Sequence, residues 1–458
     1  MTSDTARSML SDIGLALDLP SESMERVEFI GDESLPSCFA VTDLAVASIG
    51  AANLALSELL GRVGRAPNVT VDRRLSSLWF GFSIQPQGWQ IPPVWDPIAG
   101  DYRTSDGWIK LHTNAPHHKA AALRVLDCEA EKAVVANAVA AWRGDELETA
   151  IVHEGGCAAA LKSEAQWEMH PQGAAVSNEP LVISEHVKEV KNEKWSPSAK
   201  RPLHGLKVLD LTRVLAGPIA TRFLAGYGAD VLRIDPPDWD EPNVVPEVTL
   251  GKRCARLDLH DSADRQTFER LLSDADIFVH GYRADALGRL GYDATARQAI
   301  RPGLIDVSLN AYGHSGPWAG RRGYDSLVQL SSGIADRGMK WRVSDVPVSL
   351  PVQALDHATG YLIAAAVVRA VIDRLDGGDL LRARLSLART SALLRSYPSG
   401  RFDGSFEPVS ENDIENQIEH TPWGSAKRVR FPTEIVGVAN QWERPATKLG
   451  SDLAVWAV

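Results

Sequence analysis

The stretch Leu206-Lys-Val-Leu-Asp-Leu-Thr-Arg-Val-Leu-Ala-Gly-Pro218 begins the part of the chain that decides the fold. Its first six residues are mainly apolar and predict a buried strand. The Gly217-Pro218 pair begins a helix, because proline is favoured in the first helical turn. Gly226-Tyr-Gly228 ends that helix, and Asp230-Val-Leu-Arg-Ile-Asp235 predicts a second strand. Strand, helix and strand in this order predict a βαβ unit.

The same alternation continues towards the C-terminus. We expect helices at residues 265–274 and 295–299, and strands at residues 276–280 and 304–309. Strands and helices that alternate at this spacing predict an α/β protein with a doubly wound, largely parallel, Rossmann-like sheet. Ligands bind such sheets at the carboxyl ends of the strands.

The rest of the chain has other patterns. An Asp106-Gly107 turn between alternating segments predicts a hairpin, and it lies among short helical patterns that predict a small α+β domain. A polar, proline-bounded stretch predicts a linker. We expect a helical segment at 1–82, the small domain at 83–186, a linker at 187–203, the large domain at 204–400 and a tail packing back on it at 401–458.

The composition is that of an ordinary globular protein. The net charge of −11 disfavours broad binding to nucleic acid or to an anionic membrane. The four cysteines are far apart and form no metal-binding pattern, so we expect neither a metal site nor disulfides. The first residues carry acids and do not look like a signal peptide, and no apolar run reaches the ~20 residues of a membrane span. We therefore expect a cytoplasmic protein.

A second informative stretch is Pro351-Val-Gln-Ala-Leu-Asp-His-Ala-Thr-Gly360, which leads into a run rich in Ala, Val and Ile. The run predicts a buried helix that begins near Asp356. A carboxylate there gains from the helix dipole and from free N–H groups, so we expect it to stay ionised and to face outward. Asp356 is a candidate nucleophile, although aspartate is also a preferred N-cap residue with no further role.

Residues 41–60 resemble this helix, with Asp43 placed 313 residues before Asp356. The similarity suggests a duplicated element, and the alternative is a chance match of two alanine-rich helices. Asp43 precedes Leu-Ala-Val-Ala rather than His-Ala-Thr-Gly, so we interpret it as structural. The chain has no GxGxxG, GxxxxGK[ST] or GxSxG motif. Asp235 could bind a ribose hydroxyl, but NAD binding is not encoded without the glycines.

Four blocks resemble the family III CoA-transferases, which include formyl-CoA and carnitine CoA-transferases and, as a branch, the 2-methylacyl-CoA racemases. These blocks are Leu206–Pro218 with Tyr227–Pro237, Gly251–Leu259, Ala275–Gly291 and Tyr312–Asp325. The Asp356 block completes the set in the expected order. The resemblance implies the fold of that family and CoA or acyl-CoA as a substrate, with no tightly bound cofactor.

The front half resembles the same family in an unusual order. The family's Tyr-x-Thr-x-Asp-Gly segment, which marks the small domain, follows the nucleophile helix. Here it lies at Tyr102–Gly107, behind the Asp43 helix, whereas the chain after Asp356 runs almost directly into a tail. The chain thus resembles the back half of one transferase fused before the front half and tail of another. One complete site per chain is expected.

The resemblance implies a CoA site on the large domain and a covalent mechanism. The positions that match are Val214, Leu215, Ala216, Leu257, His260, Tyr282, Arg289, Arg322 and Tyr324. Arg289 and Arg322 suit phosphates, and Tyr282 suits adenine. Asp356 attacks the thioester of a donor acyl-CoA to give an anhydride, the CoA thiolate converts this to aspartyl-CoA, and an acceptor carboxylate takes over the CoA. Ser331-Ser332-Gly333 and the 83–100 loop are candidates for oxyanion donors and a lid.

Two alternatives stay open. A CoA-ester racemase or isomerase of the same fold needs a second acid or base, and the racemase branch has histidine where this chain has Tyr324, so transfer is favoured. A catalytically silent CoA-binding paralogue is the other, because a rearranged chain can keep the fold and lose turnover. The family forms interlinked dimers, so we expect a homodimer, with a pseudo-dimeric monomer as the alternative.

Overall fold

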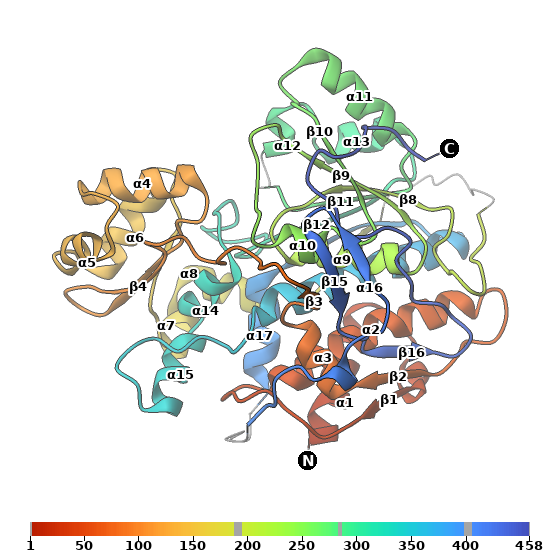
Figure 1. Cartoon of the computed structure of the whole chain (residues 1–458), viewed down its shortest axis with the longest axis horizontal. Coiled ribbons are helices and arrows are strands. Elements are labelled where there is room, and N and C mark those ends of the chain that lie inside the picture. Colours follow the sequence, from red (N-terminus) through yellow and green to blue (C-terminus); the bar gives the residue numbers. More distant parts are fainter. Residues whose placement is uncertain (1, 187–194, 283–285, 398–404, 458) are drawn as a thin grey trace.

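The structure is a computed structural model that describes residues 2–186, 195–282, 286–397 and 405–457. The predicted linker at 187–203 therefore lies partly outside the described residues. Within them, the largest sheet has seven strands in the order β10-β9-β8-β11-β12-β13-β7 (Figure 1). Their bounds are β10 Arg253–Arg256, β9 Asp230–Asp235, β8 Lys207–Leu211, β11 Ile277–His280, β12 Ile305–Asn310, β13 Leu380–Ser386 and β7 Ile183–His186.

The strands from β10 to β13 pair in parallel, and β7 pairs antiparallel with β13. Numbered along the chain, the parallel strands have the order 3-2-1-4-5-6, which is that of dinucleotide-binding folds. The winding direction reverses between β8 and β11, where the carboxyl ends leave a crevice. The predicted α/β fold with a doubly wound, largely parallel sheet is confirmed.

Helices follow most of these strands, as the alternating pattern predicted. Asp261 and Asp293 begin two of them by accepting hydrogen bonds from first-turn N–H groups, which satisfies donors that have no partner inside a helix. The helices of this region are α9 Ala216–Gly226, α10 Val245–Val248, α11 Ser262–Ser273, α12 Ala286–Arg289, α13 Ala294–Ile300, α14 Asp325–Ser331, α15 Ile334–Arg342, α16 Ala354–Leu375 and α17 Leu387–Ser396.

A small α+β unit lies apart from the large sheet (Figure 1). Its strands pair antiparallel in the order β4-β5-β6, and the Asp106-Gly107 turn joins the first two, so the predicted hairpin is confirmed. The unit contains β4 Gly100–Arg103, β5 Trp108–Leu111, β6 Ala158–Ala160, α4 Pro116–Leu126, α5 Lys132–Ala140 and α6 Gly144–His153; α7 Glu164–Met169 and α8 Pro171–Ser177 follow. The predicted range of 83–186 assigns β7 to this domain, but the hydrogen bonds of β7 join it to the large sheet. The remaining boundaries stay a prediction.

The front of the chain repeats the order of elements around Asp356. The series α1-β1-α2-β2-α3 matches α13-β12-α16-β13-α17 once α14 and α15, which lie between β12 and α16, are set aside, and in both series the two strands are parallel. An antiparallel strand then completes each set, β16 beside β2 and β7 beside β13. The front elements are α1 Thr2–Ala16, a 3-10 turn Ser21–Arg26, β1 Val27–Ile30, α2 Val41–Leu60, β2 Val69–Asp72, α3 Arg73–Trp79 and β16 Thr433–Ile435.

The two repeats exchange their closing strands. After α3 the chain forms the small domain and returns as β7 on the second repeat, whereas after α17 it returns as β16 on the first. The second return passes through a sheet of order β14-β15-β3. Its strands are β3 Ile84–Pro86, β14 Glu419–Thr421 and β15 Gly424–Arg428, and a 3-10 turn Glu411–Asp413 precedes the last two. The small domain therefore belongs in sequence to one repeat and adjoins the other.

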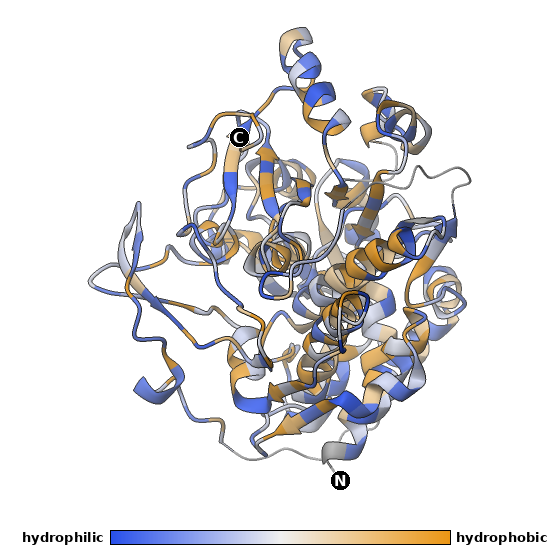
Figure 2. Cartoon of the chain, turned by 90° about the vertical axis from the view of Figure 1, so that its right-hand side faces the viewer, coloured by the Kyte–Doolittle hydropathy of each residue, from blue (hydrophilic) through white to orange (hydrophobic). Residues whose placement is uncertain are grey.

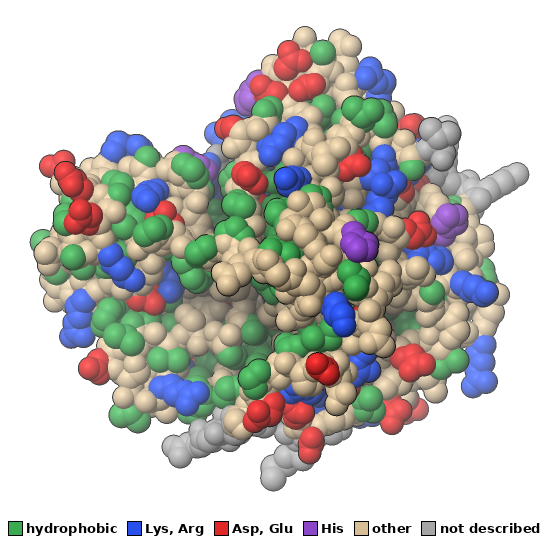
Figure 3. Space-filling view, in the orientation of Figure 1, with side chains coloured by type: hydrophobic (Ala, Val, Ile, Leu, Met, Phe, Trp, Pro, Cys, Tyr) green, Lys and Arg blue, Asp and Glu red, His purple; other side chains and the backbone are tan. Residues whose placement is uncertain are grey.

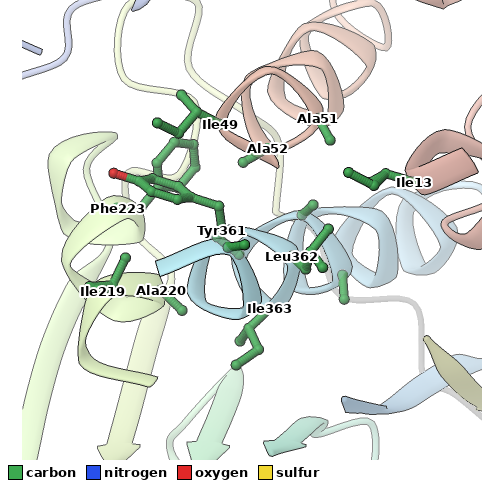
Figure 4. Packing of buried hydrophobic residues seen from close by; sticks show 14 of the residues in the cluster. Ile13, Ile49, Ala51, Ala52, Ile219, Ala220, Phe223, Tyr361, Leu362 and Ile363 are labelled. Atoms are coloured by element: carbon green, nitrogen blue, oxygen red, sulfur yellow. The ribbon is translucent and has the colours of Figure 1, made fainter. Parts of the chain in front are cut away.

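Helices α2 and α16 pack against each other in the core, where Ile49 and Ala52 of α2 lie near Tyr361 of α16 (Figure 4). Hydrophobic residues concentrate on the central elements and the outer loops are mainly hydrophilic (Figure 2). Our expectation about apolar runs was wrong, because both helices are long and apolar enough to cross a membrane. In the structure they are buried, which explains their composition.

Candidate active site

A cavity of about 1320 Å³ lies at the carboxyl ends of the parallel strands. Leu211, Pro236 and Gly281 line it where they follow or end β8, β9 and β11, and residues of the small domain line its other side. The outline of the molecule is notched between the small-domain lobe on the left and the upper lobe (Figure 3). The cavity thus occupies the place that a doubly wound sheet offers a ligand.

Asp356 lies in the first turn of α16 and in the wall of this cavity, with 8% of its surface exposed. Its backbone N–H donates to Asp325 Oδ2 at 2.9 Å. The other oxygen of Asp325 accepts from the Gln329 amide, and Gln329 Oε1 accepts from the N–H of Leu350 at 2.7 Å. Buried hydrogen bonds therefore fix the start of α16 against α14.

The pKa of Asp356 is raised well above its usual range, first by burial and then by the nearby charge of Asp325. Burial also raises the pKa of Asp325, to about 6. Our expectation that the helix N-terminus keeps Asp356 ionised was wrong, because burial disfavours the charged carboxylate and its neighbour is a second carboxylate. The pair holds a proton more firmly than separate carboxyls would.

The turn between β8 and α9 lines the same cavity. Val214 has a φ of 65°, a conformation that costs a β-branched residue energy. Its N–H donates to Glu241 Oε2 at 3.0 Å. On the far side, a side chain at Gly360 of α16 would place a Cβ 2.5 Å from the carbonyl oxygen of Ala216. Glu241 and α16 together hold the turn in its strained shape.

Residues 203–425 match the family model described as CoA-transferase family III. This region of the chain is similar to CoA-transferase family III. The predicted resemblance is confirmed, and the matched region includes Asp356, Asp325 and the turn at Val214.

Two relatives show how much of the chain is similar in sequence to known proteins. The acyl-CoA transferase of Gibberella moniliformis is 30% identical over 214 residues, which cover 43% of this chain and 37% of that protein. The succinyl-CoA:mesaconate CoA-transferase of Haloarcula hispanica is 37% identical over 109 residues, covering 20% and 28%. The chain thus spans well under half the length of these relatives. A CAIB/BAIF family protein of Brucella suis is similar in structure, with 27% identity, a TM-score of 0.38 and coverage of 49% of this chain and 65% of that one.

Most positions that the family III resemblance assigns to CoA line the cavity. They are Val214, Leu215, Ala216, His260, Tyr282, Arg289, Arg322 and Tyr324. Leu257 does not, because its side chain packs in the apolar core with Leu232 and Phe268. Asp235 is fully buried and forms an ion pair with Arg233 at 2.8 Å. It is therefore not available to a ribose.

An arginine packs on the ring of Tyr282, the residue that we expected to meet adenine. The Arg213 guanidinium carbon lies 5.0 Å from the centre of the Tyr282 ring and 4.4 Å from that of Trp239. Arg213 Nη2 also donates to the Tyr282 hydroxyl at 2.8 Å. Cation–π contacts of this kind hold a guanidinium in one orientation. Sequence reasoning missed Arg213, although it lies inside the quoted Thr-Arg-Val-Leu-Ala-Gly-Pro block.

Five aromatic rings form the small-domain side of the cavity, and we call them the ring wall: Trp95, His112, His117, His118 and Tyr324. His112 lies flat on Tyr324 with 3.7 Å between ring centres. Burial lowers the pKa of His112 to about 4 and that of His118 to about 3, so both are neutral. Sequence reasoning missed these histidines; their clustering in Leu111-His-Thr-Asn-Ala-Pro-His-His118 is the signal that could have found them.

The 83–100 loop reaches the cavity, and the Ser331–Gly333 turn does not. Residues 92–96 line the cavity, and the carbonyl of Val94 accepts from Asn243 at 2.7 Å and from Asn114 at 2.8 Å. The loop is thereby tied to both domains. Ser331 and Ser332 are buried, so they offer no oxyanion donors there.

Asp43 lies away from the cavity lining, in a buried ion pair with Arg73 at 2.8 Å. Within the described residues, no group of three or more His, Cys, Asp or Glu is placed to hold a metal ion. The four cysteines are free thiols.

Proposed function

We propose that this chain moves coenzyme A from an acyl-CoA to a carboxylic acid, with Asp356 as the nucleophile. The observation that carries the proposal is the position of Asp356. Its carboxyl lies in the wall of the cavity at the carboxyl ends of the sheet, beside Asp325. A carboxylate next to a like charge is high in energy. Formation of the anhydride removes the charge of Asp356 and so relieves its repulsion with Asp325.

The reaction proceeds through covalent intermediates on the Asp356 carboxyl. A carboxylate oxygen of Asp356 attacks the thioester carbon of the donor, the C–S bond breaks, and CoA leaves as a thiolate. The thiolate attacks the Asp356 carbonyl of the mixed anhydride and releases the donor acid. The acceptor carboxylate then attacks the carbonyl carbon of aspartyl-CoA, the C–S bond breaks, and CoA leaves as a thiolate. The thiolate attacks the acceptor carbonyl of the new anhydride, which gives the acceptor-CoA thioester and frees the Asp356 carboxylate. Tyr324 keeps its proton because burial raises its pKa, so its hydroxyl can donate to a developing oxyanion.

Three arginines of the large domain suit the CoA phosphates. Arg213, Arg289 and Arg322 line the cavity, and guanidinium groups bind phosphate oxygens by charge-assisted hydrogen bonds. The backbone of the Val214–Ala216 turn suits the pantetheine arm, because it lines the same cavity as these arginines and Asp356.

Mass spectrometry of the intact protein tests this function. The protein is mixed with acetyl-CoA, propionyl-CoA and benzoyl-CoA in turn and trapped with hydroxylamine, and any adduct is mapped. We expect the adduct on Asp356 and its loss in Asp356→Asn. Asp43→Asn is the matched control from the other repeat and should keep the adduct. Binding of CoA without an adduct from any donor would overturn the proposal in favour of the silent paralogue.

A second candidate, proton exchange at the acyl α-carbon, rests on one observation. The neutral ring of His112 lies flat on Tyr324, beside the place where the racemase branch has a histidine. A neutral imidazole there can take an α-proton while the Asp356 carboxyl supplies another. Exchange of the α-proton of propionyl-CoA in D2O, without acyl transfer, would favour this reaction.

The homodimer and the cytoplasmic location that the sequence predicts belong to the same proposal. The exchanged closing strands link the two repeats within one chain. A single chain can therefore resemble a dimer, and a pseudo-dimeric monomer is the alternative to the homodimer. Light scattering on the purified chain distinguishes the two.

A further inference from the structure

Part of the 83–100 loop lines the cavity with exposed apolar side chains. These are residues 92–96, Pro-Pro-Val-Trp-Asp, and we call them the strap. Val94 is 39% exposed and Trp95 is 41% exposed, and both prolines are exposed too. Hydrophobic and aromatic side chains form most of the lining of small-molecule pockets. The strap is therefore a candidate subsite, and it is separate from the residues assigned to CoA above.

Hydrogen bonds on both sides of Trp95 hold the strap in place. The Asn114 amide donates to the carbonyl of Val94 at 2.8 Å and accepts from the N–H of Asp96 at 2.9 Å. Asp96 Oδ2 also accepts from Lys119 Nζ at 3.0 Å. The backbone that carries the Trp95 ring is thus fixed to the small domain. A preorganised ring loses little conformational freedom when a group packs on it.

Two ring contacts connect Trp95 to the site of the reaction. Trp95 meets His112 edge-on with 5.7 Å between ring centres, and His112 lies flat on Tyr324. Tyr324 directly precedes Asp325, which accepts the N–H of Asp356. An acyl group on the Asp356 carboxyl therefore starts at one end of this series. A tail of several carbons is needed to reach Trp95 at the other end.

The charges beside the strap disfavour a tail that ends in a carboxylate. Residues 238–243 of the large domain line the cavity next to the strap, since Asn243 donates to the carbonyl of Val94 at 2.7 Å. The charged residues of this segment are all acidic: Asp238, Asp240 and Glu241. His112 is neutral, because burial lowers its pKa to about 4. A carboxylate here would meet like charges, whereas an apolar tail gains from leaving water.

Two lysines near the strap already have carboxylate partners. Lys110 Nζ lies 6.0 Å from the centre of the Trp95 ring and 2.9 Å from a carboxylate oxygen of Asp101. Lys119 pairs with Asp96. Neither lysine is among the residues that line the cavity. The surface that the strap presents to the cavity is thus apolar.

We propose that the strap binds the apolar tail of the acyl group and that Trp95 selects thioesters with a medium-chain tail over those with a short one. The inference rests on the proposed transfer, because the tail belongs to the acyl group that Asp356 receives. Donor and acceptor form their anhydrides with the same carboxyl. The strap therefore meets the tail of each acid in turn.

Calorimetry on the Asp356→Asn protein tests the subsite without turnover. Octanoyl-CoA and butyryl-CoA share the CoA and the thioester and differ only in tail length. We expect octanoyl-CoA to bind at least about tenfold more tightly, since burial of about two methylenes is enough for that factor. Suberyl-CoA has the length of octanoyl-CoA and a carboxylate at its end, so it should bind more weakly than octanoyl-CoA.

Three variants in the same Asp356→Asn background locate the preference. Trp95→Ala should bring octanoyl-CoA close to the affinity of butyryl-CoA and leave the affinity for CoA unchanged. Trp95→Leu keeps an apolar side chain and should retain part of the preference. Trp89→Ala is the control, because Trp89 lies on the same loop but stacks on Trp423 and does not line the cavity. It should keep the full preference.

Equal affinities for octanoyl-CoA and butyryl-CoA would overturn the subsite. A preference that survives in Trp95→Ala would do the same, and tighter binding of suberyl-CoA would show an anion site in place of an apolar one. Labelling of Asp356 by octanoyl-CoA in the chain with its native aspartate tests the proposed function separately. Tight binding of octanoyl-CoA without that adduct would overturn the transfer and leave the tail subsite standing, so the two failures are distinguishable.

Discussion

Arg73 Nη1 donates to Asp43 Oδ1 at 2.8 Å in a pair whose two side chains are each only 3% exposed. In the other repeat, the residue at the place of Arg73 is Leu387. Both are the first residue of the helix after the repeat's second strand, and the N-cap residues before them are Asp72 and Ser386. The first repeat pairs its aspartate with a cation, whereas in the second repeat Asp356 and Leu387 both line the cavity.

Leu387→Arg should give the second repeat the ion pair that the first repeat has between Arg73 and Asp43. A guanidinium beside Asp356 lowers the pKa of that carboxyl, by ~1–3 pH units for an adjacent opposite charge, and holds it in an ion pair. We expect the transfer rate to fall by about 100-fold or more, as for a misplaced nucleophile. Steady-state transfer and labelling of Asp356 measure this. Leu387→Met, of similar volume, should keep most activity, and an active Leu387→Arg protein would contradict the role of the missing cation.

Arg73→Met should destabilise the chain without touching the cavity. It leaves the Asp43 carboxyl buried without its cation, which costs about 3–5 kcal/mol for a buried ion pair. Urea unfolding measures the change. The double variant Asp43→Leu/Arg73→Met removes the uncompensated charge and should recover most of the lost stability. If the single variant were as stable as the wild type, the pair would have no structural role.

The large sheet could be predicted because its strands are apolar runs separated by helices, and local pattern is enough to identify such units. The closing strands could not. β7 and β16 are short, and each pairs with a strand of the other repeat, far away in the chain. Only the three-dimensional arrangement shows that residues Ile183–His186 leave the small domain for the large sheet.

The candidate site also contains residues that the sequence identifies and residues that only the structure reveals. Asp356 and the turn at Val214 lie in recognisable motifs, so the sequence identifies them. The pKa of Asp356 rises first because the carboxyl is buried and then because Asp325 of another helix lies beside it, and no sequence spacing reveals either cause. The ring wall also escaped prediction, because His112 meets Tyr324 only after the small domain folds onto the other repeat.

Asp325→Asn should move the pH dependence of transfer to lower pH. The carboxylate of Asp325 raises the pKa of Asp356, so removal of its charge lets the nucleophile ionise earlier while an amide oxygen can still accept the Asp356 N–H. We expect the rising limb of kcat/KM to move down by roughly one pH unit or more. Asp345→Asn, an exposed carboxyl, serves as the control. An unchanged limb would show that Asp325 does not set the ionisation of Asp356.

Asp356→Asn should stabilise the folded chain, and more so at high pH. A carboxyl whose pKa is raised by folding binds more protons when folded, so stability falls as pH rises from the unfolded pKa to the folded one. The asparagine removes that loss, which is about 1.4 kcal/mol for each tenfold difference between the folded and unfolded acid dissociation constants. Thermal unfolding at pH 8 should show a clear gain over the wild type, and unfolding at pH 4 little. A gain that did not depend on pH would indicate a packing effect instead.

Gly360→Ala tests whether α16 sets the shape of the CoA turn. The added Cβ would lie 2.5 Å from the carbonyl oxygen of Ala216 and 2.9 Å from Ile219 Cγ2, so the start of α9 must move. Overpacking of this kind costs about 1–3 kcal/mol, and the displaced turn should weaken CoA binding measured by calorimetry. Gly64→Ala, where an added Cβ meets nothing within 4 Å, controls for the substitution itself. Unaltered stability together with unaltered CoA affinity in Gly360→Ala would show that α16 does not hold the turn.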